Sequence, residues 1–244
     1  MDTVTRVAMT DGTDREIVKY LATVLDAVAH VPEPIAYSPA LWERWLPDTL
    51  PSSVRVLPQE LGGAIGVSDL RSMAAEASNA HGQQRLFLAA LMWGLGKKNA
   101  RMMPGLVEAL MCDPLPKALR DTVRMIRAGH PATAYEQWVA AGIPGLGPPF
   151  FTKWFYAVGL HGVPAGSLAP LVMDGNVWKS LGTLGWSSEA TTGRKYSSRP
   201  SAGYAAYLAA CQRWSEWLRA EGVDGCTPHD IEHWLFTWNG GPKR

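Results

Sequence analysis

The spacing of apolar residues constrains the fold of this chain more than any other feature, because it follows the period of a helix almost everywhere. Ile17, Leu21 and Val28 lie on one face of a helix that begins at a capping box, with Thr13 as its N-cap. No segment alternates apolar and polar residues as a half-buried strand does. Capping residues and prolines predict further helices over residues 39–45, 68–79 (capped by Ser68), 83–93, 104–111, 116–128, 132–140, 204–220 and 227–238. The pattern therefore predicts an all-α protein with at most a stray short strand.

The organisation of the chain is predicted to be a single helical domain over residues 1–244. Its 244 residues, 47% of them hydrophobic, suit one large globular domain or two small subdomains that share a core. No internal repeat or linker divides them cleanly. A polar stretch over residues 187–201 has no helical period and predicts a long loop, and long loops inside compact domains are often functional.

Charge and cysteine content exclude several classes of protein. The net charge of +1 gives no argument that the molecule as a whole binds nucleic acid or membrane. The three cysteines, Cys112, Cys211 and Cys226, are odd in number and lack metal-ligand spacing, which argues against a disulfide framework or a zinc site. No apolar run follows a basic start, and no uncharged apolar segment reaches about 18 residues. We expect a soluble cytoplasmic protein without membrane contact.

The segment GIPGLG, residues 142–147, lies between two helical patterns and predicts a specialised turn. Its glycines allow positive φ and close approach of the backbone, while Ile143 and Leu146 can plug between the two helices. Backbone N–H groups at the start of the second helix would then bind an anion, of which phosphate is the obvious candidate. Ile143, Gly145, Leu146 and Gly147 are therefore candidate DNA-phosphate ligands. The alternative is a tight turn between helices that has no partner.

This helix, hairpin and helix arrangement resembles the helix-hairpin-helix element of DNA glycosylases and related lesion-excising enzymes. Downstream, LVMDGNVW over residues 171–178 looks like the segment of that superfamily that carries its catalytic aspartate. The resemblance spans residues 132–181, and the flanking helices are similar to those of the 8-oxoguanine glycosylase-like branch, including bacterial anti-phage DNA glycosylases. The segments PFFTKWFYAVG, WGLGKKNAR and Tyr204-x-x-Tyr207, with residues 231–236, support this closer resemblance. It implies a helix-hairpin-helix glycosylase-like fold, with two helical subdomains flanking a cleft.

The resemblance makes Asp174 the candidate catalytic residue. A carboxylate beneath the sugar stabilises the oxocarbenium-like state and can orient or deprotonate the attacking water. Asp174 can also be a plain helix N-cap, and both roles can hold together. Members with lyase activity carry a lysine two residues after the final hairpin glycine, where this chain has Pro149. Lys153 follows one helical turn later and can reach the same site, contact a phosphate or extend to solvent. We therefore expect a monofunctional enzyme that uses Asp174 and water, assisted by Lys153.

Further candidate contacts to DNA lie beside interruptions of the helical pattern and in the basic second half of the sequence. A flipped base needs stacking and edge hydrogen bonds. The candidates for its pocket are Trp93, Asn99, Arg101, Trp178 and Tyr204. The candidates for phosphate contact are Lys97, Lys98, Lys179, Arg194, Lys195 and Arg199. Solvated loops explain several of these residues nearly as well, and most tryptophans, including Trp138, Trp154, Trp214 and Trp217, are predicted to be core residues.

The resemblance implies an enzyme that flips a modified base out of double-stranded DNA and hydrolyses its N-glycosidic bond. The closer resemblance implies excision of glucosylated hydroxymethylcytosine from phage DNA as a defence. An oxidised-purine repair glycosylase and a non-catalytic helix-hairpin-helix DNA-binding protein are the alternatives. No metal and no cofactor are expected, although carbonyls of the hairpin can hold a monovalent cation. The protein is expected to act as a monomer.

Overall fold

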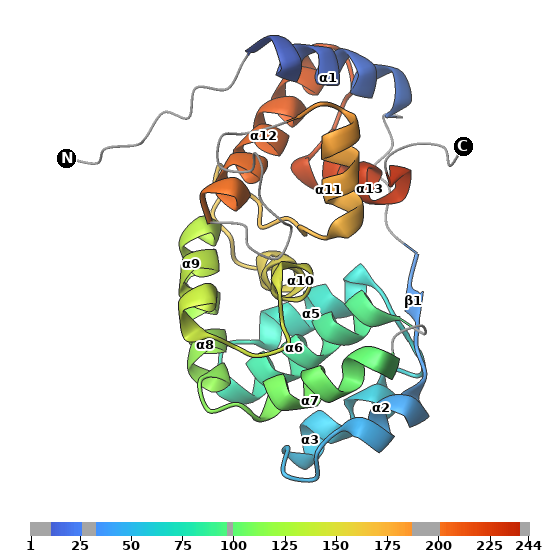
Figure 1. Ribbon diagram of the computed structural model, residues 1–244, viewed down its shortest axis with the longest axis vertical. Coiled ribbons are helices and arrows are strands. Elements are labelled where there is room, and N and C mark those ends of the chain that lie inside the picture. Colours follow the sequence, from blue (N-terminus) through green and yellow to red (C-terminus); the bar gives the residue numbers. More distant parts are fainter. Residues whose placement is uncertain (1–10, 26–32, 97–99, 187–200, 240–244) are drawn as a thin grey trace, which may run out of the picture. The chain divides into compact units, whose positions relative to one another are not determined.

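Helices account for nearly all regular structure in the computed structural model, which describes residues 11–25, 33–96, 100–186 and 201–239 (Figure 1). The chain divides into two compact units. The middle unit is continuous and covers residues 31–172, whereas the terminal unit combines residues 1–30 with residues 173–244. The predicted all-α class is confirmed. The cleft that the resemblance implies stays a prediction.

The middle unit is built around one apolar helix, α6 (Ala80–Leu95). Its residues 86–92 are all at most 1% exposed, as expected for a helix that other helices cover on every side. The other elements of the unit are β1 (Ile35–Ala36), α2 (Pro39–Trp45), α3 (Ser52–Arg55), α4 (Leu57–Glu60), β2 (Ala64–Ile65), α5 (Val67–Glu76), η1 (Ala100–Met102), α7 (Met103–Met111), α8 (Leu115–Arg127), α9 (Pro131–Ala141) and α10 (Pro148–Gly159). The two strands form a short antiparallel pair, which is the stray strand structure that the sequence allowed.

Aromatic side chains from three helices of the middle unit form its core. Phe87 of α6 packs edge-to-face on Trp154 of α10, with ring centroids 5.6 Å apart. Trp138 of α9 stacks against Phe151 of α10 at 5.7 Å. The Trp154 Nε1–H donates to Thr122 Oγ1 of α8 over 3.0 Å, so that its one polar group is satisfied inside the core. The prediction that Trp138 and Trp154 are core residues is confirmed, and this core fixes α9 and α10 on either side of the hairpin turn.

The terminal unit consists of α1 (Asp11–Val24), α11 (Gly175–Thr183), α12 (Ser201–Ala220) and α13 (Pro228–Trp238). An ion pair joins α1 to α12, with Arg213 Nη2 2.6 Å from the buried carboxylate of Asp14. The Ser180 hydroxyl of α11 donates to the backbone carbonyl of Leu235 in α13 over 2.6 Å. Trp214 is fully buried, as predicted. These contacts link segments from both ends of the chain into one core.

Several helix boundaries differ from the sequence prediction. Thr13 lies inside α1 and not at its cap, because the helix already begins at Asp11. Ser68 likewise lies inside α5, whose N-cap is Gly66 in an extended conformation, with its N–H bonded to Asp69 Oδ2 over 2.8 Å. The four-residue helices α3 and α4 were not predicted. Of the predicted loop over residues 187–201, only Ser201 lies within the described residues, and it begins α12.

Candidate active site

The hairpin turn between α9 and α10 has the geometry that its sequence predicts. Gly142, with φ +63°, ends α9, and Gly145, with φ +68°, turns the chain toward α10. Ile143 and Leu146 are only 8% and 5% exposed, so they are inserted between the helices. Gly145 and Gly147 are exposed. Since the apolar side chains point inward, the glycine backbone forms the outer surface of the turn.

The hydrogen-bond donors of this turn differ from the expected ones. Pro148 and Pro149 occupy the first two positions of α10 and have no N–H, and the Phe150 N–H already donates to the Gly147 carbonyl over 2.9 Å. Among the described residues, no backbone carbonyl accepts a hydrogen bond from the N–H of Gly145 or Gly147. The helix N-terminus therefore supplies few donors, and an anion would have to be bound by the turn itself.

The two exposed glycines differ in whether the packing of the protein requires them. A Cβ atom at Gly145 would lie 2.6 Å from the Gly105 carbonyl oxygen of α7, so close packing inside the protein explains this glycine. A Cβ atom at Gly147 would meet only Pro149 Cδ at 3.7 Å, an ordinary contact, and its φ of −75° suits any residue. Nothing in the described part of the protein needs a glycine at Gly147, which leaves close approach of a ligand as a reason for it.

Lys153 bends back toward the start of its own helix. Its Nζ donates to the Pro149 carbonyl over 3.0 Å, so the amine lies beside the residue that occupies the position of the lyase lysine. The stem of Lys153 crosses α6 at Gly94, where a Cβ atom would lie 2.4 Å from its Cδ. The half-buried side chain therefore depends on a glycine in a neighbouring helix for its path.

Trp93 precedes Gly94 on α6 and is half-buried. Its ring stacks on Tyr156 of α10, with centroids 5.3 Å apart and planes 11° from parallel, and it packs with Val67 and Val172. Its buried Nε1–H has no hydrogen-bond partner among the described residues. The predicted pocket residue is thus part of an apolar cluster, and base contact by Trp93 stays a prediction.

Asp174 begins α11 in the terminal unit. Its Oδ1 accepts from the N–H groups of Asn176 at 3.0 Å and Val177 at 3.1 Å, so it is the N-cap of that helix. The residue is 8% exposed and follows the fully packed residues 171–173. Capping uses Oδ1, and a carboxylate has a second oxygen with acceptor capacity of its own. The N-cap role and a catalytic role are therefore compatible, as the sequence allowed.

The remaining predicted site residues are distributed over both units. In the terminal unit, Lys179 is exposed on α11, Trp178 is half-buried against Trp186 at 6.1 Å, and Tyr204 is fully buried on α12. Tyr204 therefore presents no surface to a base in this structure. In the middle unit, Arg101 is exposed in η1. The residues that lie outside the described ranges are Lys97, Lys98, Asn99, Arg194, Lys195 and Arg199.

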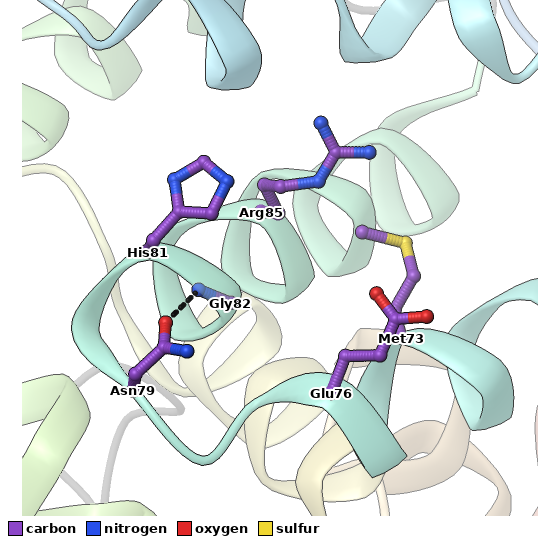
Figure 2. A pocket seen from close by; sticks show the side chains of 6 residues that line it. All are labelled: Met73, Glu76, Asn79, His81, Gly82 and Arg85. Carbon is purple, nitrogen blue, oxygen red and sulfur yellow. Dashed lines mark hydrogen bonds between the residues drawn. The ribbon is translucent and has the colours of Figure 1, made fainter.

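A pocket of about 270 Å³ between α5 and α6 contains none of the predicted site residues. Figure 2 shows the side chains that line it, Met73, Glu76, Asn79, His81, Gly82 and Arg85. Its polar groups are largely engaged: Asn79 Oδ1 accepts from the Gly82 N–H over 2.9 Å, and the guanidinium of Arg85 lies 2.6 Å from Glu60. This pocket is separate from the hairpin and from Lys153.

Sequence reasoning missed Gly94, Gly105 and Tyr156, which support the candidate residues of the middle unit. Gly94 makes room for Lys153, Gly105 contacts Gly145, and Tyr156 stacks on Trp93. Glycines inside helices are unfavourable by about 1 kcal/mol and therefore signal close packing. The sequence contains that signal at Gly94 and Gly105, but it does not indicate which residue packs against each glycine.

The comparisons with known proteins identify the family of the chain. Residues 29–236 match the model of a family described as "Putative 8-oxoguanine DNA glycosylase OGG-like protein". No curated protein and no solved structure gave a significant match. In the described part of the chain, no helix is both long and apolar enough to cross a bilayer. The family match covers most of the chain, including the hairpin and Asp174, and its description points to DNA as the substrate. The chain therefore belongs to the OGG-like DNA glycosylase family.

Proposed function

We propose that this protein flips a modified base out of double-stranded DNA and hydrolyses its N-glycosidic bond, leaving an abasic site. Family membership supports a DNA glycosylase in general. The observation that carries the catalytic part of the proposal is the buried carboxylate of Asp174, held by two backbone N–H groups at the start of α11. A carboxylate fixed in a partly apolar setting can stabilise the positive charge that develops on the sugar.

The proposed reaction needs only water as the nucleophile. As the bond between C1′ and the base nitrogen breaks, its electrons leave with the base, which then takes up a proton. The water oxygen adds to C1′, and the proton of that water passes to Asp174, which releases it to solvent, while solvent supplies the proton that the base takes up. No cofactor enters this reaction. A monovalent cation at the hairpin carbonyls remains an expectation, as does the monomeric state.

Lys153 is proposed to assist and not to form the covalent intermediate of the lyase enzymes. Pro149 occupies the position from which a lyase lysine acts, and a proline cannot supply an amine. The Lys153 ammonium lies 3.0 Å from the Pro149 carbonyl and brings a positive charge to the same turn of α10. A charge there would help to bind the phosphate backbone. The enzyme is therefore proposed to be monofunctional.

The hairpin is proposed to bind a DNA phosphate through the backbone of its turn. Gly147 is exposed, and its N–H is not used by any described carbonyl. Such contacts position the protein on DNA without reading its sequence. Recognition of the base would then come from the residues that hold the flipped nucleotide, for which Trp93 and Arg101 in the middle unit and Trp178 in the terminal unit remain candidates.

Two substrates are proposed. The resemblance to bacterial anti-phage glycosylases favours glucosylated hydroxymethylcytosine and a role in defence against phage. The description of the matched family favours an oxidised purine such as 8-oxoguanine as the second candidate. Both substrates require the same bond cleavage, so the identity of the base can be decided independently of the role of Asp174.

The test is incubation of the purified protein with unmodified, oxidised and glucosylated genomic DNA, followed by detection of abasic sites. We expect abasic sites in the glucosylated DNA, whereas sites in the oxidised DNA alone would favour the second candidate. Asp174→Asn should abolish them without unfolding α11, since asparagine caps a helix as well as aspartate does. Asp224→Asn, at an exposed position of the same unit, is the matched control. DNA binding without abasic sites in any arm would identify a non-catalytic hairpin protein.

Borohydride trapping tests the monofunctional assignment. The wild-type protein should give no covalent adduct with the DNA from which it releases a base, because no amine occupies the position of Pro149. An adduct that disappears in Lys153→Ala would show that Lys153 is the nucleophile and would overturn the proposed use of water.

A further inference from the structure

Helix α8 carries a concentration of positive charge that the proposed reaction does not use. Its basic residues are Lys117, Arg120, Arg124 and Arg127, and no other helix in the described part of the chain has as many. Asp121 is its single acidic residue. The whole chain has a net charge of only +1, so the positive charge is gathered on this helix and not spread over the molecule.

Three of these basic residues form an exposed row along α8. Lys117, Arg120 and Arg124 are spaced three and four residues apart, which places them on one face of the helix, opposite its buried apolar residues. The side chains of Lys117 and Arg124 are 66% and 74% exposed. The row extends about 10 Å along the helix axis. Arg127 does not belong to it, because its Nη2 donates to the Ala74 carbonyl over 2.6 Å and the residue is half-buried.

Asp121 holds two members of the row in place. Its carboxylate is largely buried, and it accepts a hydrogen bond from the Lys117 ammonium. Arg124 Nη2 lies 3.5 Å from the other carboxylate oxygen. Arg120 has no hydrogen bond or ion pair with any described residue. One carboxylate therefore faces three positive charges, and the row keeps an excess of positive charge.

The stability of the helix does not explain this arrangement. Like charges that are three or four residues apart on a helix repel each other. Lys117 also lies in the first turn of α8, where the helix dipole disfavours a positive charge. The row is thus unfavourable for the helix by itself and favourable toward a negatively charged partner.

We propose that the row of Lys117, Arg120 and Arg124 binds the phosphate backbone of duplex DNA outside the nucleotide that is flipped. DNA is the partner that the family implies, and each of its strands carries one phosphate per 3.4 Å of the duplex axis, so a row of about 10 Å can face three successive nucleotides. Helix α8 belongs to the middle unit and packs against α9, which ends at the hairpin (Figure 1). Contacts of this kind add affinity without reading the sequence. This inference rests on the proposed function, because it concerns how the DNA substrate is held.

The experiment measures the dissociation constant for a labelled, unmodified duplex by fluorescence anisotropy at several salt concentrations. In Lys117→Gln with Arg120→Gln, the dissociation constant should rise about threefold to thirtyfold, the effect of two exposed charge contacts. The log–log dependence of affinity on salt should become shallower by about 1.8, because two phosphate contacts are gone. Lys117→Arg with Arg120→Lys keeps both charges and should restore most of the affinity and of the salt dependence.

The matched control is Arg44→Gln with Arg71→Gln, which removes the same charge from exposed positions of α2 and α5 in the same unit. It should leave the affinity and the salt dependence unchanged. An equal effect in this control would show that only the net charge matters and would overturn the inference. Wild-type affinity and salt dependence in folded Lys117→Gln with Arg120→Gln would also overturn it and would leave the row to an acidic protein partner.

Arg120→Gln alone decides if the double variant does not fold, because Arg120 has no described partner whose loss could destabilise α8. Its salt dependence should become shallower by about 0.9, the value for one phosphate. The measurement needs no base release, so the two proposals can fail separately. Absence of abasic sites would overturn the proposed reaction, whereas unchanged duplex binding in the variants would overturn only the role of α8.

Discussion

Replacing Gly147 by alanine tests whether the hairpin turn binds phosphate. In the free protein the new Cβ would meet only Pro149 Cδ at 3.7 Å, and the backbone already has an ordinary φ of −75°. We therefore expect the free energy of unfolding to change by no more than about 1 kcal/mol, the range for such changes at a helix N-cap. A phosphate that approaches the exposed backbone would meet the added methyl group.

The size of the effect on binding follows from the contact that is lost. One hydrogen bond to a charged group is worth about 1.5–3 kcal/mol, which corresponds to a dissociation constant about ten to a hundred times weaker. The dependence of binding on salt should also become shallower by about 0.9 in log–log slope, because one phosphate contact is gone. Fluorescence anisotropy with a labelled duplex at several salt concentrations measures both quantities.

Gly145→Ala is the contrasting variant. It forces alanine to a φ of +68° and places its Cβ 2.6 Å from the backbone oxygen of Gly105, which cannot move aside as a side chain can. We expect a loss of more than about 2 kcal/mol in unfolding free energy. A folded Gly147→Ala protein with the affinity and salt slope of the wild type would refute the proposed role of Gly147. A fully stable Gly145→Ala protein would refute the packing explanation for Gly145.

Three further substitutions test contacts elsewhere in the structure. Gly94→Ala should displace the Lys153 side chain without a loss of stability, because that flexible side chain can move and alanine favours a helix by about 1 kcal/mol. Single-turnover base release should then slow as much as it does in Lys153→Ala. A hydrogen bond from Lys117 lowers the pKa of Asp121 in the folded protein. This interaction therefore stabilises the fold at pH values above the pKa of an unfolded aspartate, about 3.9, and the stabilisation is lost as the pH falls further. Denaturation should therefore show that the unfolding free energy of Asp121→Asn lies below that of the wild type by less than about 1 kcal/mol at neutral pH. This difference should disappear at acidic pH. Ser180→Ala removes one of the two hydrogen bonds to the Leu235 carbonyl, which also accepts from the Asn239 N–H, and should cost about 0.5–1.5 kcal/mol in thermal unfolding.

The helices could be predicted from the sequence where the local signals were complete. The short helix α2 has the predicted bounds because Ser38 caps it and proline occupies its first position. Helix α13 starts and ends close to the predicted residues, and a capping box of Thr227 and Asp230 fixes its start. Ser68 failed as a cap because a cap also needs an extended backbone, which Gly66 adopts two residues earlier. The helices α3 and α4 span four residues each, which is too short for any periodicity to be visible.

The candidate site could be predicted only where neighbouring residues in the sequence determine its geometry. The burial of Ile143 and Leu146 follows from a hairpin between two helices, and the structure shows it. The identity of Asp174 as a helix cap is also a local property. The path of Lys153 over Gly94 depends on how α6 packs against α10, and no spacing within either helix contains that information.

The ion pair between Asp14 and Arg213 joins residues 199 positions apart, which has a consequence for synthesis on the ribosome. Helix α1 is translated before the middle unit, whereas its partner α12 is translated after it. Until then the apolar face of α1, with Ile17, Val18 and Leu21 buried in the finished protein, has nothing to cover it. The continuous middle unit is complete in sequence much earlier. We expect nascent chains to pass through a stage with a folded middle unit and an uncovered α1, on which holding chaperones can act.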